Sequence, residues 1–260
     1  MLVNAWSGVV AANTLELTHT VYLGGLYMGS FNTEVEQDKN RYLIQTDAAT
    51  NKSMSWMFSW IAKGASQGTF EELKFKPEMH THYSKWRDKE RGADLTYTNS
   101  GDVKVDLVGK PYSDMNKYTP VKSGSISGSM DPLTMVLAAL NRFEKNGSCS
   151  GSYPVYDGRR RYDVLLRDAG VRSFKKSNYS VFRGEARGCA FEVVEKGGFR
   201  KEKSYELEDP SDLVVWVASP TNDTRPVPVR MQVKTQLGML ELHLDQYRMG
   251  DTRLASQNSK

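Results

Sequence analysis

The sequence contains little that would point to a membrane-spanning or nucleic-acid-binding protein. It has no run of about 18 consecutive apolar residues, the minimum for a helix that crosses a bilayer, so we expect no transmembrane segment. The net charge is only +4 over 260 residues. Lys and Arg are interleaved with Asp and Glu instead of forming the basic face or stripe that is typical of a nucleic-acid binder, so no nucleic-acid partner is expected.

The sequence also lacks a recognisable catalytic or metal-binding motif. Residues 147–151, Gly-Ser-Cys-Ser-Gly, look like a nucleophile elbow with Cys in place of Ser, but an elbow follows a strand and precedes a helix, and here the order is reversed. A Ser-His-Asp group can assemble in space, yet no pattern singles out a serine. His80 and His82 share one face of a predicted strand, but two ligands are too few for a metal, and His19 and His243 lie on other strands. We therefore interpret His80 and His82 as solvent-facing and expect no metal, no cofactor and no enzymatic activity; a hydrolase stays the third alternative.

The residues that are present favour a globular β protein. Hydrophobic residues make up 39% and charged residues 25%, as in folded domains, and 13 Tyr, 5 Trp and 9 Phe favour strands. Apolar and polar residues alternate in short segments separated by turn residues, which is typical of an antiparallel meander. Strands are predicted at 15–21, 26–36, 41–48, 69–75, 78–87, 93–98, 102–108, 199–207, 212–219, 227–233 and 240–244, with two more between Cys149 and Cys189. We predict a mainly β fold, a curved antiparallel sheet forming an open barrel or β-spiral, with one or two helices packed on its concave side.

The expected domain organisation is a single β-rich domain over residues 15–248. Residues 1–14 precede it as a leader, because they are mildly apolar and include small residues like the end of a secretory signal; a disordered leader is the alternative. Residues 110–130 are rich in Gly, Ser and Pro and are expected to form a mobile loop, and the polar residues 249–260 a frayed tail.

One helix is predicted with clear ends. Asp131 can cap it and Pro132 suits its first turn, where a missing N–H has no cost. Leu133, Val136, Leu137, Leu140 and Phe143 follow at helical spacing, and Gly147 would end the helix. This pattern indicates a helix that packs on the sheet.

A second helix is predicted over residues 53–63, where apolar side chains recur at helical spacing nearly all round. Such a helix must be buried or contact something apolar. It would either plug one end of a barrel or border an apolar ligand cavity. In the second case the cavity would be lined by Met54, Trp56, Met57, Phe58, Trp60 and Ile61.

Two further features concern charge and cross-linking. The residues Arg159, Arg160 and Arg161 follow an Asp-Gly turn and are candidates to contact an anionic head group, because guanidinium groups fit phosphate and carboxylate; a solvated turn with a structural salt bridge is the alternative. If the protein is exported, its only two cysteines, Cys149 and Cys189, would be expected to pair, contributing about 3–4 kcal/mol.

The segment from Cys149 to Cys189, together with the Asp-Pro-Leu start of the helix at residues 131–133 and Gly-Gly-Phe at 197–199, resembles a family of exported bacterial proteins of unknown function. The resemblance covers most of residues 15–248. It implies a periplasmic location in a Gram-negative bacterium and a Cys149–Cys189 disulfide. More loosely, such proteins are similar to curved-sheet envelope proteins, including the lipoprotein carriers LolA and LolB and the envelope-integrity proteins.

These observations lead to one functional hypothesis and one main alternative. The hypothesis is a non-enzymatic, monomeric envelope protein of the periplasm that binds an apolar or lipid-like ligand, or a partner protein. The alternative is a structural or interaction module whose core is filled. A continuous apolar cavity would favour the first, and a close-packed interior the second.

Overall fold

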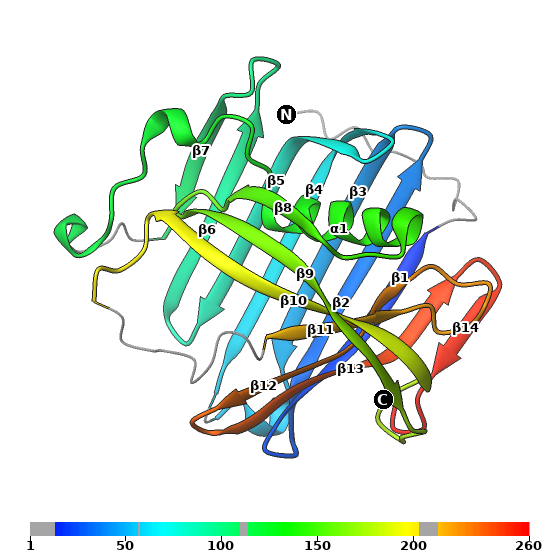
Figure 1. Ribbon diagram of the computed structural model, residues 1–260. Coiled ribbons are helices and arrows are strands. Elements are labelled where there is room, and N and C mark those ends of the chain that lie inside the picture. Colours follow the sequence, from blue (N-terminus) through cyan, green and yellow to red (C-terminus); the bar gives the residue numbers. More distant parts are fainter. Residues whose placement is uncertain (1–13, 57, 110–113, 203–212, 260) are drawn as a thin grey trace, which may run out of the picture.

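A computed structural model describes residues 14–56, 58–109, 114–202 and 213–259, and in this part of the chain the strands form one antiparallel sheet (Figure 1). The strands are β1 (Leu15–Leu23), β2 (Leu26–Asp38), β3 (Arg41–Thr50), β4 (Trp60–Glu71), β5 (Lys74–Trp86), β6 (Lys89–Tyr97), β7 (Val103–Val108), β8 (Gly151–Tyr156), β9 (Arg161–Phe174), β10 (Gly184–Gly197), β11 (Val214–Ala218), β12 (Val227–Thr235), β13 (Gly238–Met249) and β14 (Thr252–Ala255). Their order is β7-β6-β5-β4-β3-β2-β1-β13-β12-β11-β10-β9-β8, and β14 pairs with β13.

The sheet is two meanders joined at one seam. Strands β1 to β7 pair in sequence order, strands β8 to β13 do the same, and β1 pairs with β13, with Leu15 opposite Met249. The sheet curves strongly and stays open, because β7 and β8 end the strand order and do not pair with each other. A curved, open antiparallel sheet confirms the predicted fold class. The hairpins predicted at 26–48 and 227–244 are also confirmed as β2–β3 and β12–β13.

Helix α1 (Pro132–Asn146) lies in the hollow of the curved sheet, with β4 and β5 on one side and β8 on the other (Figure 1). Its ends are those predicted from the sequence. The Asp131 carboxylate accepts hydrogen bonds from the N–H groups of Leu133 and Thr134, and Gly147 ends the helix with a φ of 66°, a left-handed conformation that glycine adopts without strain. Where α1 crosses β4, a Cβ on Gly64 would lie 3.4 Å from the Leu133 side chain. Glycine at this position therefore allows the helix to approach the sheet closely.

The main hydrophobic core fills the space between α1 and the concave face of the sheet. Leu137 and Ala138 are buried on the helix. They belong to one cluster with side chains from both meanders, among them Leu15, Leu17, Ile44, Val155, Val164, Val227, Val229 and Leu244. Burial of this helix face is what fixes α1 in the hollow.

The helix predicted at 53–63 is wrong. The chain forms a short 3₁₀ turn (η1, Lys52–Met54) and then enters β4 at Trp60. The Asn51 side chain accepts from the N–H of Ser53, and the hydroxyl of Ser55 donates to the Lys52 carbonyl. Such local hydrogen bonds compete with an α-helix, and the Trp and Ile that follow favour a strand. One α-helix, not two, therefore occupies the concave side in the described part of the chain.

Two other predictions need correction, the strand at 69–75 and the frayed tail at 249–260. Residues 69–75 are not one strand, because β4 turns into β5 between Glu71 and Lys74. The mobile loop over 110–130 stays a prediction; in its described part, 114–130, the N–H of Thr119 donates to the Phe199 carbonyl and Arg161 donates to the Ser125 carbonyl. The expected frayed tail forms β14 against β13, since its backbone continues the ladder.

Two predictions fall largely or partly outside the described residues. They are the leader over 1–14, of which 1–13 are not described, and the strand over 199–207, whose residues 203–207 are not described.

Candidate functional site

An apolar groove of about 440 Å³ runs along α1, between the helix and the concave face of the second meander. The residues that line it are Met135, Val136, Ala139, Leu140 and Phe143 of α1, the cysteines 149 and 189, and Tyr162, Val164, Leu166, Phe191, Val193, Val215, Val217, Pro228, Met231 and Leu242. None of these side chains is charged, and Tyr162 supplies the only hydroxyl group. The volume lies within the range of small-molecule sites, about 300–1,000 Å³.

A second cavity, of about 150 Å³, adjoins the groove on the other side of the helix. It lies between α1 and strands β1 to β3, and it shares Val136, Leu140 and Pro228 with the larger groove. Its lining is mainly apolar and also includes His19, Thr33, Thr46 and Arg225. Apolar space therefore lies on both sides of α1, next to the first meander and next to the second.

Several apolar side chains of the groove remain exposed to solvent. Val136 on α1 is 45% exposed and Val193 on β10 is 43% exposed. Apolar groups gathered along one concave groove, in contrast to scattered single residues, mark a site for an apolar partner or ligand.

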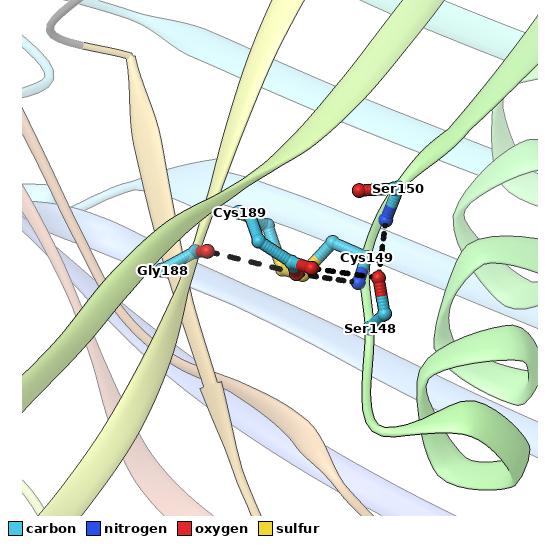
Figure 2. The surroundings of a disulfide bond; sticks show 6 residues. Ser148, Cys149, Ser150, Gly188 and Cys189 are labelled. Atoms are coloured by element: carbon cyan, nitrogen blue, oxygen red, sulfur yellow. Dashed lines mark hydrogen bonds between the residues drawn. A yellow bond between two sulfur atoms is a disulfide. The ribbon is translucent and has the colours of Figure 1, made fainter.

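The predicted disulfide forms one wall of this groove. Figure 2 shows Cys149, in the segment that follows α1, joined to Cys189 on β10. Their Cα atoms are 5.6 Å apart, within the range that a disulfide spans. Both cysteines are buried and pack with Val217, Leu140 and Phe143. The bond therefore links the end of the helix to the sheet directly beside the groove.

A carboxylate holds the segment that carries Cys149. Asp168 on β9 accepts from the Ser148 hydroxyl at 2.7 Å and from the Cys149 N–H at 2.9 Å. These two hydrogen bonds lower the pKa of Asp168 below its usual range, because they stabilise the charged form. The chain is thus fixed where it leaves α1 and begins β8.

The predicted cavity residues do not line this groove. Phe58 packs against Trp86 with their ring centroids 4.1 Å apart, and Trp60 lies opposite Trp86 on β5. Trp56 is 81% exposed. Met54, half-buried, and Ile61, exposed, are at the same end of the sheet, and Met57 lies outside the described residues. In the sequence, two other patterns mark the groove residues. Apolar residues recur at helical spacing on α1, and apolar and polar residues alternate on β9 and β10.

The three predicted anion-contact residues separate into two groups. Arg161 is buried and has a structural role: it donates to the Ser125 and Tyr162 carbonyls and pairs with Asp163 at 2.6 Å. Arg159 and Arg160 instead line a polar cleft of about 420 Å³. The other residues of this cleft are His82, Ser84, Arg91, Tyr118, Asp157, Gly198, Phe199 and Arg200.

A buried polar network lies between this cleft and α1. The Ser66 hydroxyl donates to Asp131 Oδ1 at 2.6 Å and lies 2.7 Å from His80 Nδ1, which is itself 3.2 Å from Asp131 Oδ1. On its other side, His80 Nε2 lies 3.2 Å from His82 Nδ1. Burial acts to raise the pKa of Asp131, but the hydrogen bonds with His80, Ser66 and Thr134 outweigh it and hold the pKa below its usual range.

This network is not a catalytic triad. In a triad the serine and the carboxylate contact opposite ring nitrogens of the histidine, whereas Ser66 and Asp131 both contact the same nitrogen of His80. His80 is 3% exposed and His82 is half-buried, so the prediction of solvent-facing histidines is wrong. A strand pattern could not reveal this, because the carboxylate that covers His80 comes from the cap of a distant helix.

The remaining histidines are buried elsewhere. His19 Nε2 lies 2.8 Å from the Pro228 carbonyl, and Arg230 donates to His243 Nδ1 at 2.9 Å. Burial, reinforced by Arg230, lowers the pKa of His243 to about 4. Among the residues that the structure describes, no group of three His, Cys, Asp or Glu side chains could hold a metal, and no helix is long and apolar enough to cross a membrane.

Comparison with known proteins places these features in a family. A solved beta-barrel-like protein of the domain of unknown function DUF1849, from Brucella abortus, is similar in fold, with a TM-score of 0.50 over 93% of this chain and 99% of that one, at 11% sequence identity. No curated protein matches the sequence. The comparisons show no link to LolA or LolB. The model of the family DUF3108, described as a protein of unknown function, matches residues 18–245, and the chain therefore belongs to that family.

Proposed function

We propose that this protein binds an elongated apolar ligand, such as the acyl chain of a lipid, in the groove beside α1. The observation that carries the proposal is the groove itself: it measures about 440 Å³, the described residues that line it include no charged side chain, and it is open to solvent at Val136 and Val193. A filled core would leave no such space, so the groove favours ligand binding over the structural module.

The periplasm is the compartment that fits this proposal. A disulfide buried in the wall of the groove is formed and kept in an oxidising compartment, whereas cytosolic thiols are kept reduced. Thiol labelling, in denaturant, of protein released from cells by osmotic shock tests this expectation, because both cysteines are buried in the native fold. Labelling of Cys149 and Cys189 without added reductant would contradict it.

The affinity expected for an acyl chain follows from burial of its methylene groups. Each methylene contributes about 0.8 kcal/mol, which corresponds to roughly a fourfold gain in affinity per carbon. Association itself has a cost of about 4 kcal/mol or more, so short chains should bind weakly. Affinity should rise with chain length and stop rising once the groove is full.

The test measures displacement of a fluorescent fatty acid by unlabelled fatty acids of eight to eighteen carbons, roughly the range that the groove's volume suggests. Val193→Asp places a carboxylate in the groove wall and should weaken binding by at least about tenfold, because an apolar chain cannot solvate a charge. Val171→Asp is the matched control, since Val171 is also an exposed valine, on β9, and does not line the groove. An affinity that does not depend on chain length, or equal losses in the two variants, would refute the proposal.

A further inference from the structure

A second site, separate from the apolar groove, is the polar cleft between β5, β6 and the turn that joins β8 to β9. Four arginines line it: Arg91, Arg159, Arg160 and Arg200. Among the described residues of its lining, Asp157 is the one carboxylate, so the four arginines leave an excess of positive charge there. A concave surface lined mainly by one sign of charge concentrates ions of the opposite sign.

The β8–β9 turn holds two of these arginines in place. Asp157 accepts from the N–H groups of Arg159 and Arg160 and from Arg160 Nε, at 3.0, 2.7 and 2.8 Å. Gly158 has a φ of 88°, and a Cβ there would lie 2.6 Å from the Ala93 side chain, so the turn sits tightly against β6. Arg159 also donates to the Val108 carbonyl. The guanidinium groups are therefore oriented before any ligand arrives, which lowers the entropic cost of binding.

An aromatic ring completes the positioning. Arg160 lies over the ring of Phe199, with its Cζ 5.7 Å from the centroid, and Phe199 itself is fixed by backbone hydrogen bonds to Thr119. A guanidinium that stacks on a ring is held in a defined plane, and its fork of N–H groups matches the geometry of a planar or tetrahedral oxyanion.

His82 lies between the cleft and the buried network that contains His80. The Ser66 hydroxyl donates to Asp131, so His80 Nδ1 carries a proton toward this pair. On the other side of its ring, His80 Nε2 lies 3.2 Å from His82 Nδ1. The remaining nitrogen of His82, Nε2, is then the one available to a ligand in the cleft.

We propose that this cleft binds a phosphate-type oxyanion, held by Arg160 and Arg200 and by His82 in its protonated form. The proposal does not rest on lipid binding in the groove, because the same chemistry recognises free phosphate and a phosphate ester. Arg200 is the most informative arginine to change: its side chain is exposed, and its backbone, not its guanidinium, forms the bridge to Tyr118.

Binding should depend on pH in a defined direction. Burial lowers the pKa of His82, the neighbouring His80 lowers it further, and Arg160 and Arg159 act in the same direction, while Asp157 opposes them. Among the described residues, the charged and titratable groups around His82 are His80 on its own strand, Arg91 on β6, Tyr118, Asp157, Arg159 and Arg160 on the turn, and Arg200. A bound anion adds negative charge beside the imidazole and should raise its pKa, so phosphate should bind more tightly as the pH falls through the pKa of His82.

The test is a pH titration of the histidine ring resonances by NMR, with and without inorganic phosphate at constant ionic strength. His82 is assigned from the His82→Gln variant. We expect phosphate to raise the pKa of His82 by about one pH unit and to leave His243 unchanged. Arg200→Gln should weaken phosphate binding by about tenfold, whereas Arg253→Gln, which removes an exposed arginine on β14, should have no effect.

Two further arms separate the sources of the anion and decide the outcome. Lysophosphatidic acid that displaces inorganic phosphate from His82 would identify a lipid phosphate as the ligand, and a lack of displacement would identify a free anion; both support the site. The inference is overturned if phosphate leaves the pKa of His82 unchanged, or if Arg253→Gln weakens binding as much as Arg200→Gln.

Discussion

Replacement of Asp131 by alanine tests the buried network that joins α1 to the sheet. The carboxylate accepts at Oδ1 from the N–H groups of Leu133 and Thr134 and from the Ser66 hydroxyl, and at Oδ2 from the Thr134 hydroxyl at 2.6 Å. It also lies 3.2 Å from His80 Nδ1. Asp131 is fully buried, so water cannot replace these interactions in the variant without rearrangement.

The expected magnitude follows from the groups that lose their acceptor. Loss of a helix cap costs about 1 kcal/mol, and each buried donor left without a partner costs about 1–3 kcal/mol. Because the donors of Ser66, Thr134 and His80 share one acceptor group, their losses overlap, and we expect Asp131→Ala to lower the free energy of unfolding by about 4–6 kcal/mol. For a chain of this size that corresponds to a Tm lower by roughly 10–20 °C.

Urea unfolding followed by circular dichroism, with the disulfide oxidised, measures this change. Asp131→Asn is the control that separates capping from charge, because Asn caps a helix as well as Asp does. It should cost about half as much as the alanine variant, since one oxygen still accepts while the charge is lost. A loss below about 1 kcal/mol for Asp131→Ala, or equal losses for the two variants, would show that the network does not stabilise the fold as described.

The pH dependence provides an independent check on the same residue. The pKa of Asp131 is lower in the folded protein than in the unfolded chain, where it is about 3.9. The ionised carboxylate therefore contributes its full stability above that value and loses it as the pH falls toward the lower folded pKa. The difference in stability between the wild type and Asp131→Asn should narrow below about pH 4. A difference that stays constant down to pH 2 would contradict this assignment.

Three further predictions concern the core, the disulfide and a buried histidine. Leu137→Ala should lower the free energy of unfolding by about 2–5 kcal/mol in chemical denaturation, because this side chain of α1 is buried in the core. A change below about 0.5 kcal/mol would show that this face of the helix is not packed. Cys149→Ser should lower the free energy of unfolding by about 3–4 kcal/mol in oxidising buffer and should match the wild type once reductant is present. The pKa of His243 falls from 6.5 to about 4 on folding, so the unfolded chain takes up the proton first and wild-type stability should decline as the pH falls from 6.5 to 4. His243→Gln should flatten that decline in thermal melts, and an unchanged slope would show that another group causes it.

The sequence predicts those parts of the fold that depend on local chemistry. The ends of α1 follow from Asp131, Pro132 and Gly147, whose side chains or conformations act within a few residues. The alternation in β1 and β12 is visible because one face of each strand meets the core. By contrast, residues 53–63 belong to two different elements, the connection that contains η1 and the start of β4. Apolar residues from both happen to match the period of a helix, although they do not form one.

The groove could not be predicted in the same way, because its walls come from segments far apart in the chain. Met135 on α1, Phe191 on β10 and Met231 on β12 meet only when the sheet has curved and the strand order is known. The histidine pair shows the same limit. In the sequence His80 is one polar residue on a predicted strand. Its burial depends on the tertiary contact with Asp131, which a strand pattern does not reveal.

The seam between β1 and β13 determines the order in which the chain can reach its native state. Each meander is made of neighbouring hairpins and can form from local contacts, but the seam brings Leu15 and Met249 together from opposite ends of the described chain. Contacts of such large sequence separation form late, because the loop between them must first be closed. During synthesis β1 therefore keeps one unpaired edge until β13 has been made, and an open edge of this kind recruits other strands. Productive folding of the whole sheet therefore requires that this edge of β1 stays protected until β13 pairs with it.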